Sequence, residues 1–325
     1  MKNSLIASIA ALAGHALAQQ PGGSINSPAA LASPGTGPYG AARPTLCRHL
    51  HFFEDPSLPK FVIYQPKNIP KGFKAPVVVW GNGGCLNVGT IMAPFLLQLA
   101  SQGVVVLATG PKEDPSKGGT FASYGGYGQV TAKAFIDALD WAEKSATDPK
   151  WAHIDMSRVA AAGQSCGGTL AYAAEGDKRV NRGLGIFNSG NFAKEGSKDA
   201  KSGKDAKGKL MVYTDVTKFS KPVFYFLGGP KDVAYANGKR DYALLPAGIP
   251  SYMSNWAPTG HGGTFNELNG GAYGIAASHW ANWVLRGNAT AANWFTGGGA
   301  KAAGWTETES KNLDSLKIPA PIRKF

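Results

Sequence analysis

Residues 158–168 read RVAAAGQSCGG, and this stretch decides the predicted fold. An apolar run leads into the pattern G-x-S-x-G, in which Ser165 stands between Gly163 and Gly167. A serine at the tip of a sharp strand-to-helix turn adopts a strained backbone conformation, and a Cβ two residues before or after it would clash. The stretch therefore predicts a strand, a tight turn that presents Ser165, and a helix beginning near Cys166 whose positive end faces the hydroxyl. A tight turn with no chemical role is the alternative.

Short apolar runs on both sides of this turn predict the rest of a sheet. Several runs are nearly continuous, which is typical of strands buried on both faces of a parallel sheet. We expect strands over 77–80, 104–108, 159–162, 184–187, 223–227 and 251–256, after a hairpin formed by 47–53 and 60–64. Helices are expected over 91–102, 130–145, 167–175 and 273–286. This alternation predicts one α/β domain over 44–325, with a doubly wound, mostly parallel sheet.

The composition argues against several other classes of protein. The chain has 325 residues, and its 43 Gly and 21 Pro disfavour a helical bundle or a coiled coil. The formal net charge is +12, and much of the excess lies in residues 194–209, where six Lys stand among three acidic residues, Gly and Ser. That segment is expected to be a solvated loop insertion. Because no aromatic residues alternate with these lysines, we expect no nucleic-acid partner.

The N-terminal residues predict export from the cell. Lys2 precedes an apolar segment and the small-x-small sequence that ends at Ala18. We interpret 1–18 as a secretory signal peptide and 19–43, rich in Pro, Gly and Ser, as a flexible leader. The apolar segment is too short to span a membrane, so the protein is expected to be secreted without a membrane span. Asn288 begins a glycosylation sequon, as expected of a secreted glycoprotein.

A serine hydroxyl needs a general base before it can act as a nucleophile. Five of the six histidines lie in segments that do not suit this role, namely His15, His49, His51, His153 and His279. His261 lies in a glycine-rich loop directly after the last expected strand, where open α/β sheets bind ligands. Asp232 follows the preceding strand and is the expected partner of the histidine, with Asp215 and Asp241 as rivals. The order Ser165, Asp232, His261 is the chain order of nucleophile, acid and base in one known fold.

These segments together resemble the secreted serine esterases of the α/β-hydrolase fold. The likeness covers residues 75–290 and is carried by VVVWGNGG, DMSRVAAAGQSCGG, VFYFLGGPKD and TGHGGTF. The chain most resembles the branch of dienelactone-hydrolase-like, chlorophyllase-like and polyester-hydrolase-like enzymes. The resemblance implies a catalytic triad of Ser165, His261 and Asp232 that cleaves carboxylic esters through an acyl-enzyme, with no cofactor and no metal.

The resemblance also implies two backbone N–H groups that stabilise an oxyanion. One belongs to Cys166, and the other belongs to the loop that contains Asn82, Gly83 and Gly84, where we favour Gly83. Related enzymes often carry His-Gly or Pro-Gly in this loop, whereas this chain reads WGNGG from Trp80, so the choice of the loop N–H stays open. A glycine-rich turn without function is the alternative.

The chain has three cysteines, Cys47, Cys85 and Cys166. In the related fold the loop and the turn are neighbours, so a disulfide between Cys85 and Cys166 is expected to tie the two oxyanion donors together. A bond from Cys47 to either of them is the alternative.

Six further residues are candidates to line a substrate pocket, because they stand at or just after the ends of expected strands or in the loop of the oxyanion donors. Ordinary core packing explains each of them equally well. They are Trp80, Asn82, Tyr124, Tyr127, Phe192 and Trp256.

Other functions fit the sequence less well. A dinucleotide-binding enzyme needs G-x-G-x-x-G at the first strand-to-helix turn, and the turn that begins Gly81-Asn-Gly83 lacks the third glycine. No Gly-Lys pair is followed by Ser or Thr, so a P-loop is absent, and the pair His49 and His51 has no clear third metal ligand. Two alternatives remain: an amidase or peptidase that uses the same triad, and an inactive hydrolase-fold protein that binds a partner. We expect a monomer that acts on a small or polymeric ester.

Overall fold

The computed structural model describes residues 33–39, 52–66, 69–114, 116, 126, 128–192 and 213–322. Several sequence predictions fall outside these residues. They concern the signal peptide, Cys47, His49 and His51, the pocket candidates Tyr124 and Tyr127, and the lysine-rich segment 194–209.

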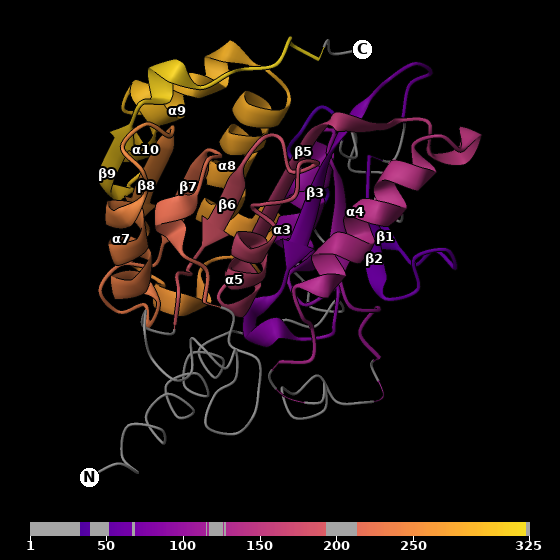
Figure 1. The fold of residues 1–325 in the computed structure, drawn as a ribbon, viewed down its shortest axis with the longest axis horizontal. Helices are drawn as coiled ribbons and strands as arrows, with labels where there is room; N and C mark the ends of the chain where they lie inside the picture. The colour runs from indigo at the N-terminus through magenta and orange to yellow at the C-terminus, as the bar shows by residue number, and fades with distance from the viewer. Residues whose placement is uncertain are drawn as a thin grey trace.

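A nine-stranded mixed sheet runs through the centre of the molecule (Figure 1). Its strands lie in the order β1-β2-β4-β3-β5-β6-β7-β8-β9. The strands from β4 to β8 in this order are parallel, whereas β1, β2 and β9 pair with their neighbours antiparallel. The bounds are β1 Phe52–Phe53, β2 Phe61–Tyr64, β3 Ala75–Gly81, β4 Val105–Thr109, β5 Ile154–Gln164, β6 Leu184–Phe187, β7 Val223–Leu227, β8 Ser251–Asn255 and β9 Thr306–Lys311.

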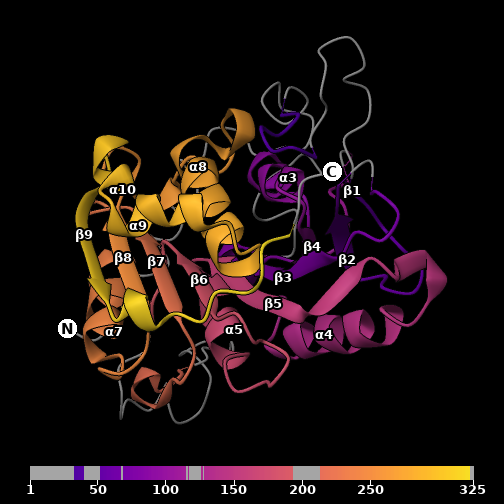
Figure 2. The same cartoon turned by 90° about the horizontal axis from the view of Figure 1, so that it is seen from above.

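Helices cover both faces of this sheet (Figure 2). One face carries α3 Ala93–Ser101, α8 Gly271–Trp280, α9 Asn293–Thr296 and α10 Gly299–Ala302. The other carries α4 Lys133–Ser145, α5 Cys166–Ala173 and α7 Tyr235–Leu244. The prediction of an α/β fold with a mostly parallel sheet is therefore confirmed. None of the helices in the described ranges is long and apolar enough to cross a membrane.

The alternation of side chains along β3 explains why its sequence is a continuous apolar run. Successive side chains of a strand point to opposite faces. Val77 and Val79 belong to the hydrophobic core on one side of the sheet, whereas Val78 and Trp80 belong to the core on the other. All four side chains are buried, so an unpaired polar side chain at any of these positions would lose its hydrogen bonds to water.

The structure differs from the predicted elements mainly at the ends of the sheet. Strand β9, which was not predicted, reads TETESK and is largely exposed. It forms the edge beside β8, where charged residues discourage pairing with another chain. Because it has no apolar pattern, the sequence gives no signal for it. The helix predicted over 273–286 ends at Trp280 and continues as a π-helical segment, Ala281–Leu285.

Part of the expected flexible leader is packed against the folded chain. Tyr39 is buried, and its ring centroid lies 5.0 Å from that of Phe73. The N–H of Tyr39 donates to the carbonyl of Ser101, and the N–H of Gly35 donates to the side chain of Asn269. The single aromatic residue in a stretch of small residues is the signal for this contact.

Candidate active site

Ser165 stands at the sharp turn between β5 and α5, with φ 54° and ψ −125°. A residue other than glycine rarely adopts such a conformation, which costs on the order of 1–3 kcal/mol. A Cβ on Gly163 would lie 2.3 Å from the carbonyl carbon of Gly167, and a Cβ on Gly167 would lie 1.9 Å from the carbonyl oxygen of Gly81. The steric reason predicted for both glycines of G-x-S-x-G is thus confirmed, and Gly167 also allows β3 to approach the turn.

Replacing Gly167 by alanine should therefore destabilise the protein by about 3 kcal/mol or more, since the new Cβ overlaps main-chain atoms that cannot rotate away. Gly176 is the matched control, because a Cβ there meets nothing within 4 Å. Chemical denaturation of both variants measures the difference. A free energy of unfolding that falls equally in both variants would show that the close approach of β3 and α5 is not the cause.

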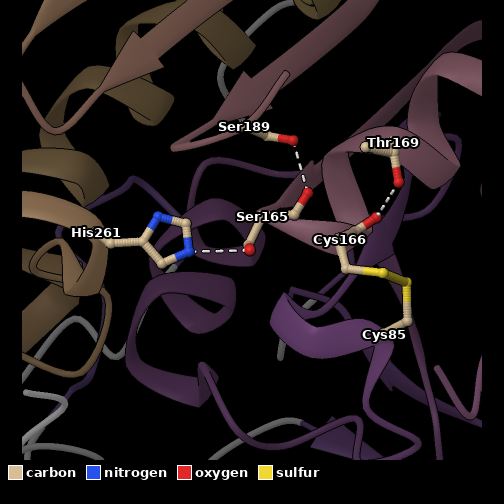
Figure 3. The surroundings of a disulfide bond; sticks show 6 residues. All are labelled: Cys85, Ser165, Cys166, Thr169, Ser189 and His261. Atoms are coloured by element: carbon tan, nitrogen blue, oxygen red, sulfur yellow. Dashed lines mark hydrogen bonds between the residues drawn. A yellow bond between two sulfur atoms is a disulfide. The ribbon is translucent and has the colours of Figure 1, made fainter. Parts of the chain in front are cut away.

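The turn places Ser165 beside His261, which in turn contacts Asp232, although the three residues are far apart in the sequence. Figure 3 shows Ser165 and His261. The Nε2 atom of His261 lies 2.9 Å from the Ser165 hydroxyl oxygen, and its Nδ1 atom lies 2.5 Å from Oδ1 of Asp232. An ionised carboxylate can only accept, so Nδ1 carries the proton. This tautomer leaves Nε2 free to accept the proton of the serine hydroxyl.

The carboxyl ends of parallel strands account for this meeting. Asp232 follows β7, and His261 lies in the short 3-10 helix Gly260–Gly262 after β8. The Asp232 side chain is fully buried, and its two oxygens accept the N–H of Ala234 at 2.8 Å and of Gly228 at 3.1 Å. The main chain thus holds the carboxylate at a fixed angle to the imidazole.

The rival acids lie elsewhere. Asp215 caps the 3-10 helix Val216–Lys218 and accepts the N–H of Thr217 at 3.1 Å. Asp241 is buried in α7, where it accepts the N–H of Asn191 and pairs with Arg240. Its burial raises the pKa of this carboxyl. Neither contacts His261.

The other described histidines have structural partners. His153 lies with its Nε2 atom 3.1 Å from the side-chain oxygen of Gln65. His279 stacks on Trp294, with 4.5 Å between ring centroids. Burial lowers the pKa of both imidazoles. These contacts agree with their exclusion as general bases.

Two backbone N–H groups near Ser165 are available to an anion. Cys166 is the first residue of α5, and Gly83 is the first residue of the 3-10 helix Gly83–Cys85, so neither N–H has an acceptor within its own helix. A Cβ on Gly83 would lie 3.7 Å from the Cβ of Ser165. Both expected donors therefore stand beside the serine side chain.

A disulfide joins these two segments (Figure 3). It links Cys85 to Cys166 with 5.2 Å between their Cα atoms. This is the pairing expected from the resemblance, and not one with Cys47. The sulfur atoms connect the end of one helix to the first residue of the other, next to Ser165.

Sequence reasoning missed two hydroxyl groups that hold this turn. Ser189 donates to the carbonyl oxygen of Ser165 at 2.6 Å, and Thr169 donates to the carbonyl oxygen of Cys166 at 2.7 Å (Figure 3). Ser189 follows the apolar strand β6, and a polar residue at the carboxyl end of a buried strand is the signal that could have indicated it.

Two of the predicted pocket residues cannot face a ligand. Trp80 and Asn82 are fully buried. The indole N–H of Trp80 donates to Asn82 Oδ1, and the Asn82 amide donates to the carbonyls of Val88 and Thr109 at 2.9 and 2.8 Å. Their prediction as substrate contacts is therefore corrected: these side chains fix the loop from within the core.

The remaining predicted residues have mixed positions. Phe192 and Trp256 are half-buried, and the Trp256 ring lies 5.8 Å from that of Trp305. Asn288 is half-buried too, and its Oδ1 atom accepts from the hydroxyl of Thr290. Within the described ranges no group of three or more His, Cys, Asp or Glu side chains could hold a metal ion.

No known protein family matches the chain, and no curated protein is detectably similar to it.

Proposed function

We propose that this protein is a secreted serine hydrolase of the α/β-hydrolase type, with one catalytic domain, that cleaves carboxylic esters. The observation that carries the proposal is the hydrogen-bonded chain from the Ser165 hydroxyl to Nε2 of His261 and from Nδ1 to Asp232, at 2.9 and 2.5 Å. The strained backbone at Ser165 lowers the stability of the protein, and a purely structural role of the serine gives no reason for this strain. A role as nucleophile does, because the turn presents the hydroxyl to the imidazole.

In the acylation step the Ser165 oxygen attacks the ester carbonyl carbon while His261 removes the hydroxyl proton at Nε2. Asp232 stabilises the positive charge that develops on the imidazole. The imidazolium then returns the proton to the leaving alkoxide as the carbon–oxygen bond breaks, which releases the alcohol and leaves an acyl-enzyme.

The negative charge on the carbonyl oxygen needs donors that are already in place. The N–H groups of Cys166 and Gly83 stand next to Ser165 and are the candidates for this role. The loss of one such donor typically lowers turnover by about 100- to 1,000-fold. The positive end of α5 adds to the same field.

Deacylation repeats these steps with water as the nucleophile. His261 takes a proton from the water, the hydroxide oxygen bonds to the acyl carbon, and Ser165 leaves as its proton returns from Nε2. The products are a carboxylic acid and the free enzyme.

Secretion has separate support. A disulfide persists mainly in oxidising compartments. Cys85 and Cys166 form one beside the proposed nucleophile. Together with the signal peptide predicted over 1–18, this supports an extracellular enzyme.

Labelling with a fluorophosphonate probe tests the proposal directly. The probe should form a covalent bond to Ser165 in the folded protein, located by peptide mass mapping, and urea-unfolded protein should not react. A folded protein that leaves Ser165 unlabelled favours the alternative of an inactive binding protein.

A panel of esters and matched amides then tests the bond type. We expect esters of varied acyl length and aromatic content to be cleaved faster than amides with the same acyl group. Resonance makes an amide carbonyl less electrophilic than an ester carbonyl, and an amide nitrogen must be protonated before it can leave. Faster amide cleavage would identify the amidase alternative and overturn the ester assignment.

Removing the disulfide should affect both stability and turnover. The double variant Cys85→Ala, Cys166→Ala should lose about 3 kcal/mol of unfolding free energy. Its kcat should fall by about 100-fold, because the two donor segments are no longer tied together. Cys47→Ala is the control, since that cysteine is not part of this disulfide. An unchanged kcat in the double variant would show that the disulfide does not position the donors.

A further inference from the structure

Asn188 has a conformation and a set of contacts that the proposed reaction does not yet use. It follows β6, is fully buried and has φ 43°, a value that non-glycine residues adopt rarely and asparagine more often than most. Its side-chain amide donates to the carbonyl oxygens of Gly260 at 3.1 Å and His261 at 3.0 Å. One buried amide therefore holds two successive carbonyls of the histidine loop.

The orientation of this amide is fixed from its other end. The hydroxyl of Tyr273 donates to Oδ1 of Asn188 at 2.6 Å. Burial raises the pKa of the Tyr273 hydroxyl, so it keeps its proton and remains a donor. Because the two loop carbonyls can only accept, the amide nitrogen must face them and the oxygen must face the tyrosine.

Gln164 makes a second contact to the same carbonyl. Its side-chain nitrogen donates to the carbonyl oxygen of His261 at 3.1 Å. It is buried and directly precedes Ser165. The side-chain oxygen of Gln164 lies against Gly83: a Cβ added to Gly83 would stand 2.1 Å from that oxygen. The side chain therefore spans from the histidine loop to the loop of the proposed oxyanion donor.

The histidine loop needs such restraint. It is rich in glycine, and Gly260 and Gly263 both have φ 58°. Glycine gives a loop more backbone freedom than any other residue. A displacement of about 1 Å at a reacting group can lower a rate by about 100-fold. A base on this loop therefore depends on contacts that hold its main chain.

We propose that Asn188 and Gln164 are positioning residues for the general base: by holding the main-chain carbonyl of His261, they set the imidazole in line with the Ser165 hydroxyl. This inference rests on the proposed function, because it assigns a role in that reaction. Neither side chain touches the reacting atoms. Both act through His261, from the carboxyl ends of the neighbouring strands β5 and β6.

The test compares Asn188→Asp with Asn191→Asp in the full-length protein. Asn188→Asp keeps the shape and the acceptor for Tyr273 but places a carboxylate oxygen against two carbonyls. We expect kcat on a p-nitrophenyl ester to fall about 100-fold, with KM within about threefold of the wild type. Asn191 is equally buried on the same segment, but among the described residues the hydrogen bonds of its side-chain amide go to Thr214 and none goes to the histidine loop. Asn191→Asp should lower the melting temperature without the loss of kcat.

Two further variants keep the inference testable if Asn188→Asp does not fold. Asn188→Gly accommodates the positive φ and removes the amide, and Gln164→Met keeps the size of the side chain and removes the donor. Each should lower kcat at least about tenfold with KM retained. A kcat within threefold of wild type in a folded Asn188 variant would overturn the inference, provided that the wild type is active.

A proton NMR measurement separates this inference from the proposed function. The Nδ1 proton between His261 and Asp232 should give a downfield resonance, absent in His261→Ala, that shifts in Asn188→Asp and stays in place in Asn191→Asp. If the wild-type protein cleaves no ester but shows this pattern of resonances, the proposed function is overturned. The placement of His261 by Asn188 then still stands. An unshifted resonance in Asn188→Asp would overturn the placement by Asn188.

Discussion

Ser165→Ala should lower kcat on any ester that the wild type cleaves by at least about 10⁴-fold, since removal of the nucleophile from a triad can cost about 10⁶-fold. The alanine variant retains the Cβ of serine and hence the same strain at φ 54°. It loses only the hydroxyl that donates to His261. Its free energy of unfolding should therefore stay within about 1 kcal/mol of the wild type.

Steady-state kinetics and chemical denaturation measure the two quantities. Ser157→Ala is the matched control, since Ser157 is an exposed serine near the start of the same strand β5. It should retain wild-type turnover. Residual activity of Ser165→Ala near the wild-type level, after purification that excludes contaminating esterases, would refute the role of Ser165.

The second large effect is expected for Asp232→Asn, with kcat lower by about 10⁴-fold. Each carboxylate oxygen of Asp232 accepts a main-chain N–H, from Ala234 or from Gly228. The amide nitrogen of asparagine must therefore face one of these donors. If this amide nitrogen also faces Nδ1 of His261, Nδ1 must accept its hydrogen bond and the imidazole proton moves to Nε2. The imidazole can then no longer accept the hydroxyl proton of Ser165.

The same assay measures this variant, and Asp215→Asn is its control. Asp215 caps a short helix through Thr217, and asparagine caps a helix about as well as aspartate does. The control should keep its kcat and its melting temperature. Equal kcat values for the two variants would show that Asp232 does not orient the base.

The turn and the sheet could be predicted because their signals are local. The apolar runs around 77–80 and 223–227 predict buried strands because both faces of β3 and β7 are covered by helices. The steric need for Gly163 and Gly167 follows from the strain at Ser165. Residues near the carboxyl ends of neighbouring parallel strands meet at one edge of a sheet. For that reason His261 and Asp232 could be selected from six histidines and several acids without coordinates.

The contacts that hold the site could not be predicted in this way. Asn188 and Gln164 reach His261 across 73 and 97 positions of the chain, and nothing in their neighbouring residues indicates that partner. Trp80 and Asn82 show the converse, since their place beside the glycine-rich loop suggests a pocket while their side chains turn into the core.

The sequence by itself determined the buried strands, the sharp turn at Ser165, and which hydroxyl, imidazole and carboxylate reach the same edge of the sheet. These follow from backbone sterics and from the period of apolar residues, both of which act over a few positions. Only the tertiary structure decided which buried amides hold the histidine loop and which aromatic rings face inward. Such contacts depend on where distant strands end in space, because a hydrogen bond exists only when two groups lie within about 3 Å.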